Sequence, residues 1–159
     1  MSVAMRLVLV GGAWTTLALM ADGGGLRAPV DVVADDRSVS AGMWGVVTVE
    51  MNGKRLDDEF VAMLKIAYQA DGAWTVLFKG LVVGEGRSQN DPATNPKTFE
   101  METRGGKKTK PRRYTGIYRM EGDSRQLCFV SDGMPRPDDF TAPRKSGRIL
   151  VTLRRTAAH

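Results

Sequence analysis

The sequence has little of the side chains on which most metal and enzyme sites depend. Its 159 residues include one cysteine, Cys128, and one histidine, the terminal His159. A single cysteine excludes an intramolecular disulfide, and within its apolar run Cys128 is predicted to be a buried, inert thiol. One terminal histidine leaves no basis for a histidine metal site or a catalytic triad. We therefore expect no metal and no cofactor, and we interpret the chain as non-enzymatic.

Carboxylates are the remaining candidates for catalysis, and three pairs stand close together in the sequence: Asp57/Asp58, Glu100/Glu102 and Asp138/Asp139. Glu100 and Glu102 share one face of a predicted strand, where two carboxylates could flank a substrate. Because apolar residues alternate with them, we expect both glutamates on the solvent side. An enzyme that acts through carboxylates is therefore a less favoured alternative.

Positive charge is plentiful in only one segment. The chain carries a net charge of +5, whereas residues 104–113 alone carry +6, so the remainder is −1. The six basic residues are Arg104, Lys107, Lys108, Lys110, Arg112 and Arg113. Only Tyr114 offers an adjoining aromatic ring, so nucleic acid is not expected as a partner. Such a loop fits an acidic protein or an anionic polymer, and a solvated hairpin loop without a function is the alternative.

The N-terminus lacks the length of apolar sequence that a membrane span requires. Residues 1–21 contain one charge, Arg6, followed by a short apolar run, a pattern typical of a signal peptide. We expect export to the periplasm or the extracellular space, with no transmembrane span in the mature chain. A cytoplasmic protein with an apolar tail is the alternative. Residues 22–40, rich in Gly, Asp and Ser, are predicted to be a flexible linker, and residues 156–159 a disordered tail.

What the sequence does have is a series of short strand-like segments between turn signals. Eight such segments lie within residues 41–155, at 43–51, 64–69, 74–79, 81–88, 97–103, 114–120, 125–130 and 149–155. Asp57–Leu64 has the spacing of a short amphipathic helix, and the proline-containing residues 131–146 are predicted to be an irregular strap. The pattern predicts an all-β fold, an eight-stranded antiparallel up-and-down barrel with one short helix after the first strand.

Alternating apolar residues on different strands are candidates for the lining of the barrel. They are Tyr68, Phe78, Met101, Tyr118, Phe129 and Leu153. Barrels of this size either hold one small ligand or are filled by their own side chains. The pattern leaves both alternatives open.

The ends of the domain resemble the lipocalin pattern. Gly42 and Trp44 open the first strand, and the last strand carries arginines. The resemblance implies that Trp44 plugs one end of the barrel and that a late arginine packs over the indole. Of Arg148, Arg154 and Arg155, we favour Arg154 for this role.

A closer resemblance covers roughly residues 41–155 and is to a small lipocalin-like domain family of unassigned function, abundant in planctomycetes. Four segments carry it. They are Trp44–Lys54 ending in Asn-Gly-Lys, Asn95-Pro96-Lys97-Thr98-Phe99, Gly-Ile-Tyr-Arg-Met-Glu-Gly-Asp at 116–123, and Pro135-Arg136-Pro137 followed by Phe140. The resemblance implies a fold and no activity, because the family has no established catalytic residues. The density of lysine and arginine at 104–113 departs from the family, so a role for that loop is not inherited.

Two functional hypotheses follow. The first is a non-enzymatic carrier or sensor that binds a small apolar ligand inside the barrel. The alternative is a protein-interaction module, an inhibitor or immunity-type partner, that acts through the basic loop 104–113 and the strap 131–146 over a solid core.

Overall fold

The computed structural model describes residues 40–157. The predicted signal peptide, residues 22–39 of the predicted linker, and His159 lie outside the described residues. Within residues 40–157, no helix has both the length and the apolar character needed to cross a membrane.

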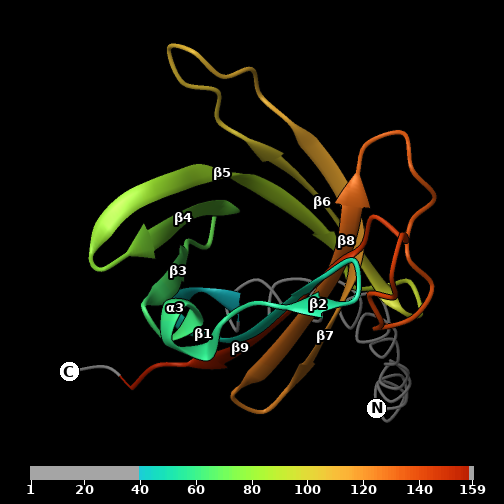
Figure 1. Ribbon diagram of the computed structural model, residues 1–159, viewed down its shortest axis with the longest axis horizontal. Coiled ribbons are helices and arrows are strands. Elements are labelled where there is room, and N and C mark those ends of the chain that lie inside the picture. The colour runs from blue at the N-terminus through green and yellow to red at the C-terminus, as the bar shows by residue number, and fades with distance from the viewer. Residues whose placement is uncertain (1–39, 158–159) are drawn as a thin grey trace, which may run out of the picture. The chain divides into compact units, whose positions relative to one another are not determined.

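The described chain forms a closed antiparallel β-barrel (Figure 1). Its elements are β1 (Gly42–Met51), β2 (Lys54–Arg55), α3 (Asp58–Ala62), β3 (Leu64–Tyr68), β4 (Ala73–Phe78), β5 (Leu81–Asp91), β6 (Lys97–Thr103), β7 (Arg113–Glu121), β8 (Ser124–Ser131) and β9 (Ile149–Arg155). Each strand from β3 to β8 pairs with the next along the chain, and β1 pairs with both β3 and β9 to close the barrel. The predicted eight-stranded up-and-down barrel with one short helix is confirmed, and β2 is an additional strand on the edge of β1.

The unpredicted strand β2 arises from the turn that the sequence places after β1. Asn52 and Gly53 both have positive φ, 52° and 78°, as a two-residue hairpin turn requires. The chain therefore folds back at once, and Lys54 and Arg55 pair with Met51 and Glu50. Two residues are too few to give an alternating pattern, which is why the sequence analysis did not detect this strand.

Helix α3 is shorter than the predicted span Asp57–Leu64. Asp57 is its N-cap, and the Asp57 carboxylate accepts a hydrogen bond from the backbone N–H of Phe60. The helix ends at Ala62, because the backbone carbonyl of Met63 accepts a bond from Lys79 N–H at the end of β4 and Leu64 already belongs to β3. The helix buries Val61 in the main core cluster.

A β-bulge in β1 adjusts which of its side chains face the barrel. Val46 pairs with Leu153 and Thr48 pairs with Thr152, so Val47 has no partner in β9. Val46 and Val49 are both buried in the core although they are three residues apart, whereas Val47 is exposed. The bulge thus keeps the second half of β1 in contact with the interior.

The strap predicted at 131–146 covers the outside of the barrel over β7, β8 and β9. Beneath it, Ile117, Cys128, Ala142 and Leu150 form a second buried cluster against which Phe140 packs. The Cys128 thiol donates to the carbonyl of Thr141 in the strap, and burial raises the pKa of this thiol to about 11. Cys128 is therefore a protonated packing residue at neutral pH.

Candidate functional site

The strand register places the six predicted lining residues on the inner face of the barrel. Residues that lie directly opposite each other on paired strands point to the same face of the sheet. Such pairs are Tyr68 with Trp74, Met101 with Tyr114, and Tyr118 with Leu127. Leu153 pairs with Val46 and Arg125, Phe129 with Gly116 and Ile149, and Phe78 with Leu64.

These six residues differ in what they contact. Tyr118 and Leu153 are completely buried in the main core cluster, and Tyr68, Met101 and Phe129 pack against that cluster while remaining half-buried. The ring of Phe78 lies 5.2 Å from that of Phe60 in α3. The inner face is therefore solid around Tyr118 and Leu153 and more open elsewhere.

Trp44 closes the solid part of the interior. Its indole is 0% exposed, and Nε1 donates to the carbonyl of Ser40 at 3.0 Å. The guanidinium carbon of Arg155 lies 4.4 Å from the indole centroid, a cation–π contact. The Arg155 Nη1 also donates to the carbonyl of Ala41 at 2.9 Å, which fixes the arginine over the ring.

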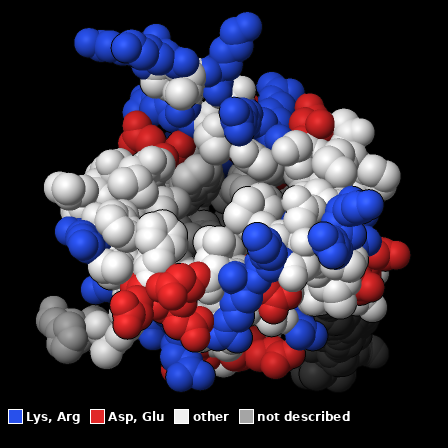
Figure 2. All heavy atoms as spheres, in the orientation of Figure 1, with Lys and Arg blue, Asp and Glu red and all other residues white. Residues whose placement is uncertain are grey.

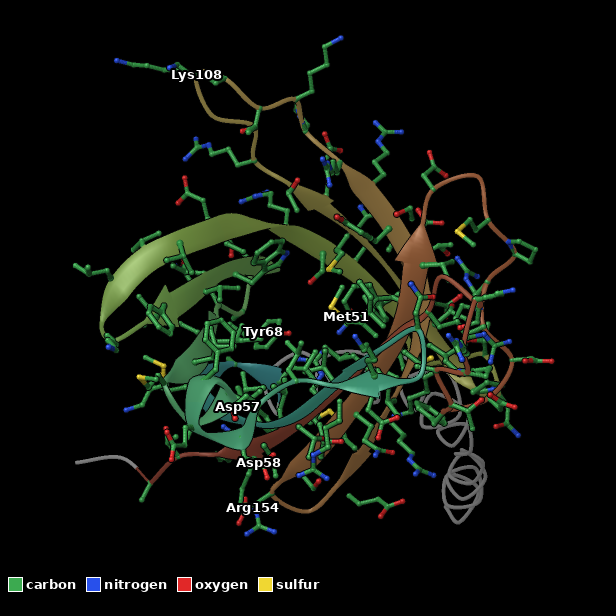
Figure 3. All side chains as sticks on the ribbon, in the orientation of Figure 1. Met51, Asp57, Asp58, Tyr68, Lys108 and Arg154 are labelled. Carbon is green, nitrogen blue, oxygen red and sulfur yellow. The ribbon has the colours of Figure 1, made fainter. Side chains whose placement is uncertain are left out.

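The prediction that Arg154 covers Trp44 is corrected by this contact. Arg155 pairs directly with Trp44 across β1 and β9 and is two residues from the buried Leu153, so Arg155 shares their face. Arg154 lies on the opposite face and its side chain points away from the barrel (Figure 3). Arg148, the third candidate, is bound in the strap by Asp138 and Asp139 at 2.9 and 2.7 Å.

The two sides of the barrel are filled unequally. The inward residues of β1, β8 and β9 include Val46, Leu127 and Val151, which are buried. The inward residues Ile66 of β3 and Val76 of β4 are apolar but only half-buried. The space-filling view shows a hollow at the centre of the face it presents (Figure 2).

Strand β5 contributes to this openness because its inward positions carry small residues. Gly84 pairs with the inward Val76, Gly86 with Trp74, and Ser88 with Met101. At Gly86 a β-carbon would collide with the backbone carbonyl oxygen of Glu102 and with the Trp74 ring. Above Gly84, by contrast, a β-carbon would meet only Val76 at an ordinary 3.8 Å. Room for a side chain therefore remains at Gly84.

Arg125 is an inward-facing residue that sequence reasoning did not identify. It pairs with Met120 and Leu153, and it is 2% exposed. Its guanidinium carbon lies 4.4 Å from the ring centroid of Tyr68 and 5.5 Å from that of Tyr118. Its Nε and Nη1 atoms have no hydrogen-bond partner. Arg125 alternates with Leu127 and Phe129, and this alternation is the signal that could have placed it on the inner face. Its charge obscured the signal, because charged residues are expected on the outer face.

A small pocket of about 130 Å³ lies beside Arg125. Its wall comes from the end of β3, the turn 69–72, β5 and β8, and includes Tyr68, Ser88 and Asn90. The Asn90 side-chain oxygen is also buried without a partner. Burial raises the pKa of Tyr68, and the positive charge of Arg125 partly offsets this effect.

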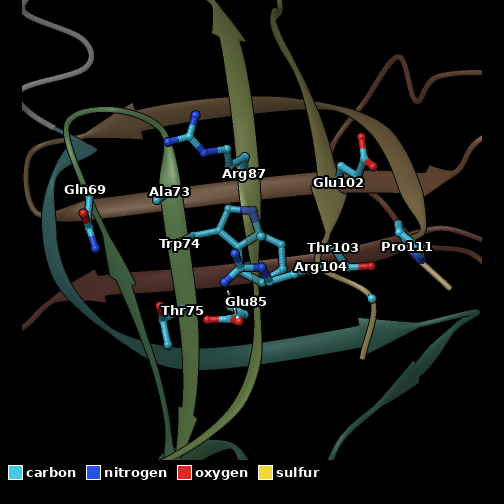
Figure 4. A pocket seen from close by; sticks show the side chains of 12 residues that line it. Gln69, Ala73, Trp74, Thr75, Glu85, Arg87, Glu102, Thr103, Arg104 and Pro111 are labelled. Atoms are coloured by element: carbon cyan, nitrogen blue, oxygen red, sulfur yellow. Dashed lines mark hydrogen bonds and ion pairs between the residues drawn. The ribbon is translucent and has the colours of Figure 1, made fainter. Parts of the chain in front are cut away.

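A larger groove of about 730 Å³ lies between β4, β5 and β6, at the base of the loop that contains residues 104–112. Charged side chains line much of it, and an ion pair of 3.2 Å joins Arg104 with Glu85 there (Figure 4). Trp74 lines the same groove. None of the six predicted lining residues borders this groove.

The three carboxylate pairs have structural partners. Asp57 is the N-cap of α3, and Asp58 forms an ion pair of 2.9 Å with Arg55. Glu100 and Glu102 are exposed and pair with Arg136 and Arg113 at 3.3 Å. Arg148 holds both members of the third pair. Within residues 40–157, no group of three or more Cys, His, Asp or Glu is arranged to hold a metal ion.

The basic loop projects from one end of the barrel, with Lys108 at its tip (Figures 1 and 3). Arg104 and Arg113, at its two ends, pair with glutamates of β5 and β6. Lys107 and Lys108 are exposed, and Lys108 extends away from the barrel (Figure 3). The space-filling view shows basic side chains gathered at this loop (Figure 2). Lys110 and Arg112, like these lysines, are exposed.

The fold and the site define a closed antiparallel barrel whose interior is filled on one side and hollow on the other. Comparisons of the chain with models of protein families, with curated proteins and with solved structures found no match. The resemblance to the lipocalin-like domain family therefore stays a prediction.

Proposed function

We propose that the protein is a non-enzymatic carrier or sensor that binds a small apolar ligand inside the barrel. The observation that supports the proposal best is the unequal filling of the interior. Apolar side chains of β3 and β4 face inward without being fully buried, opposite the glycines of β5. A ligand that covers these side chains gains about 25 cal/mol for each Å² of apolar surface removed from water.

The rigidity of the surrounding barrel favours this use of the hollow. Hydrogen-bonded neighbours surround each of the eight barrel strands, and the core cluster around Trp44 fixes one side of the interior. A preformed pocket costs less conformational entropy on binding than one that must be ordered by its ligand. The hollow therefore suits an apolar ligand that enters without unfolding the wall.

Filling the space at Gly84 is expected to weaken ligand binding. The substitution Gly84→Leu places an isobutyl group beside Val76 and occupies volume that the ligand would use. We expect an affinity at least ten-fold lower for the neutral fluorescent probe N-phenyl-1-naphthylamine, measured by fluorescence titration of the full chain.

The matched control is Gly45→Leu on β1. Gly45 lies between the inward residues Trp44 and Val46 and therefore faces outward, and a β-carbon there meets only ordinary contacts, the nearest at 3.5 Å. The control should bind the probe as the unchanged chain does. Equal probe affinity of all three proteins would contradict a binding site in the hollow.

The alternative, a protein-interaction module, stays a prediction. The projecting basic loop is compatible with it, since Lys107 and Lys108 are exposed and Lys108 lies at a distance from the barrel wall. The strap is less suited to binding a partner by changing its conformation, because Cys128, Phe140 and Arg148 hold it against the sheet. Export also stays a prediction, because it rests on residues outside the described part of the chain.

A further inference from the structure

The buried guanidinium of Arg125 points to the chemical class of the ligand. We propose that Arg125 binds the carboxylate of a small monocarboxylic acid whose apolar part occupies the barrel hollow. This inference rests on the proposed function and extends it from an apolar ligand to an amphipathic acid.

The first argument is the cost of burying this charge. Arginine is almost never fully buried unless it is paired, since transfer of a charge out of water is expensive. Arg125 is 2% exposed, yet no ion pair joins it to another described residue, and two of its three guanidinium nitrogens lack any hydrogen-bond partner. A buried group that leaves donors unmet is the arrangement that an incoming acceptor completes.

The second argument is the geometry of the contacts that Arg125 does make. The rings of Tyr68 and Tyr118 lie against the guanidinium at 4.4 and 5.5 Å, and such contacts use its π-system rather than its N–H groups. The N–H groups at its edge therefore stay available. A guanidinium offers these donors in a planar fork that matches the two oxygens of a carboxylate.

Arg155 provides an internal comparison. It also lies over an aromatic ring, that of Trp44, but its Nη1 donates to the carbonyl of Ala41. Arg155 is thus a packing residue whose guanidinium has a hydrogen-bond partner, and it shows the contacts that a structural arginine makes in this barrel. Arg125 has the ring contacts without the hydrogen bonds.

The third argument is the pocket beside Arg125. Its volume of about 130 Å³ corresponds to about four water molecules at liquid density, enough for a carboxylate and the carbons next to it. Asp71 also lines this pocket, but its carboxylate is bound by Arg87 at 2.7 Å and by the backbone N–H of Ala73. One unpaired buried cation favours a monoanion over a phosphate dianion.

The test is calorimetric titration of the full chain with octanoate, with 1-octanol as its neutral counterpart, with acetate as its counterpart without the apolar body, and with inorganic phosphate. We expect octanoate to bind at least ten-fold more tightly than octanol, because hydrogen bonds to charged groups are among the strongest in proteins. Tighter binding of phosphate than of octanoate would overturn the assignment to carboxylic acids.

The variant Arg125→Met should remove the preference for octanoate over octanol. Arg125→Lys keeps the charge but not the planar fork, and we expect it to lose most of the preference; circular dichroism verifies that each variant is folded. Arg154→Met removes an exposed arginine from the neighbouring strand and should keep the full preference.

The outcomes separate this inference from the proposed function. If octanol binds but octanoate binds no better, or if Arg125→Met and Arg125→Lys keep the preference, the carboxylate site is wrong and the apolar site stands. If octanol does not bind but acetate binds in an Arg125-dependent way, the anion site stands and the apolar function is wrong. Failure of octanol, octanoate and acetate to bind would overturn both.

Discussion

Replacing Trp44 with alanine is expected to destabilise the barrel by about 3–5 kcal/mol, the range for truncation of a large buried aromatic residue. The indole is fully buried in the core, donates a hydrogen bond to Ser40 and supports the guanidinium of Arg155. The substitution removes all three interactions and leaves a cavity. Urea unfolding followed by circular dichroism measures the change in the free energy of unfolding.

Two arginine variants provide the control for this prediction. Arg155→Ala should cost about 1–2 kcal/mol through the lost cation–π contact and the lost hydrogen bond to Ala41. Arg154→Ala, at an exposed position, should change the stability by no more than about 0.5 kcal/mol. A larger loss for Arg154→Ala than for Arg155→Ala would contradict the assignment of Arg155 to the indole.

The second large effect is expected at Gly116 in β7, where no side chain fits. A β-carbon there would collide with the carbonyl oxygen of Cys128, would lie 2.6 Å from Cβ of Phe129 and would lie 2.8 Å from a ring carbon of Phe99. Two of these atoms belong to rigid parts of β8, so the strands would have to separate. We expect Gly116→Val to destabilise the fold by about 3 kcal/mol, the upper end of the range for overpacking.

Thermal and urea unfolding of Gly116→Val, with Gly45→Val as the matched control, measure this effect. Gly45 faces outward and has only ordinary contacts, so the control should remain close to the unchanged chain. A Gly116→Val protein as stable as the control would show that β7 and β8 are not as close as described.

Alternation of apolar residues was sufficient to predict the barrel and the direction of its lining residues. The same rule, applied strictly, would have identified Arg155, because it is two residues beyond Leu153 on β9. It would also have placed Arg125 inside, because Arg125 alternates with Leu127 and Phe129. For Arg125, the expectation that charged residues lie outside prevented the prediction. For Arg155, the choice fell instead on its neighbour Arg154, which lies on the opposite face of the strand.

Other features could not be predicted because they depend on packing in three dimensions. The bulge at Val47 changes the phase of β1, and a bulge has no reliable signal in one sequence. Whether a small barrel is hollow or filled depends on how side chains from several strands meet. The glycines of β5 leave space at Gly84, whereas Trp74 fills the space at Gly86.

Native mass spectrometry of the full chain purified from its own host tests the central claim most directly, because it detects a ligand retained in the barrel. We predict a species heavier than the bare chain by one small molecule, which is released on denaturation and identified as a carboxylic acid with an apolar body. Detection of the bare chain alone, both as purified and after incubation with octanol or octanoate, would contradict the account.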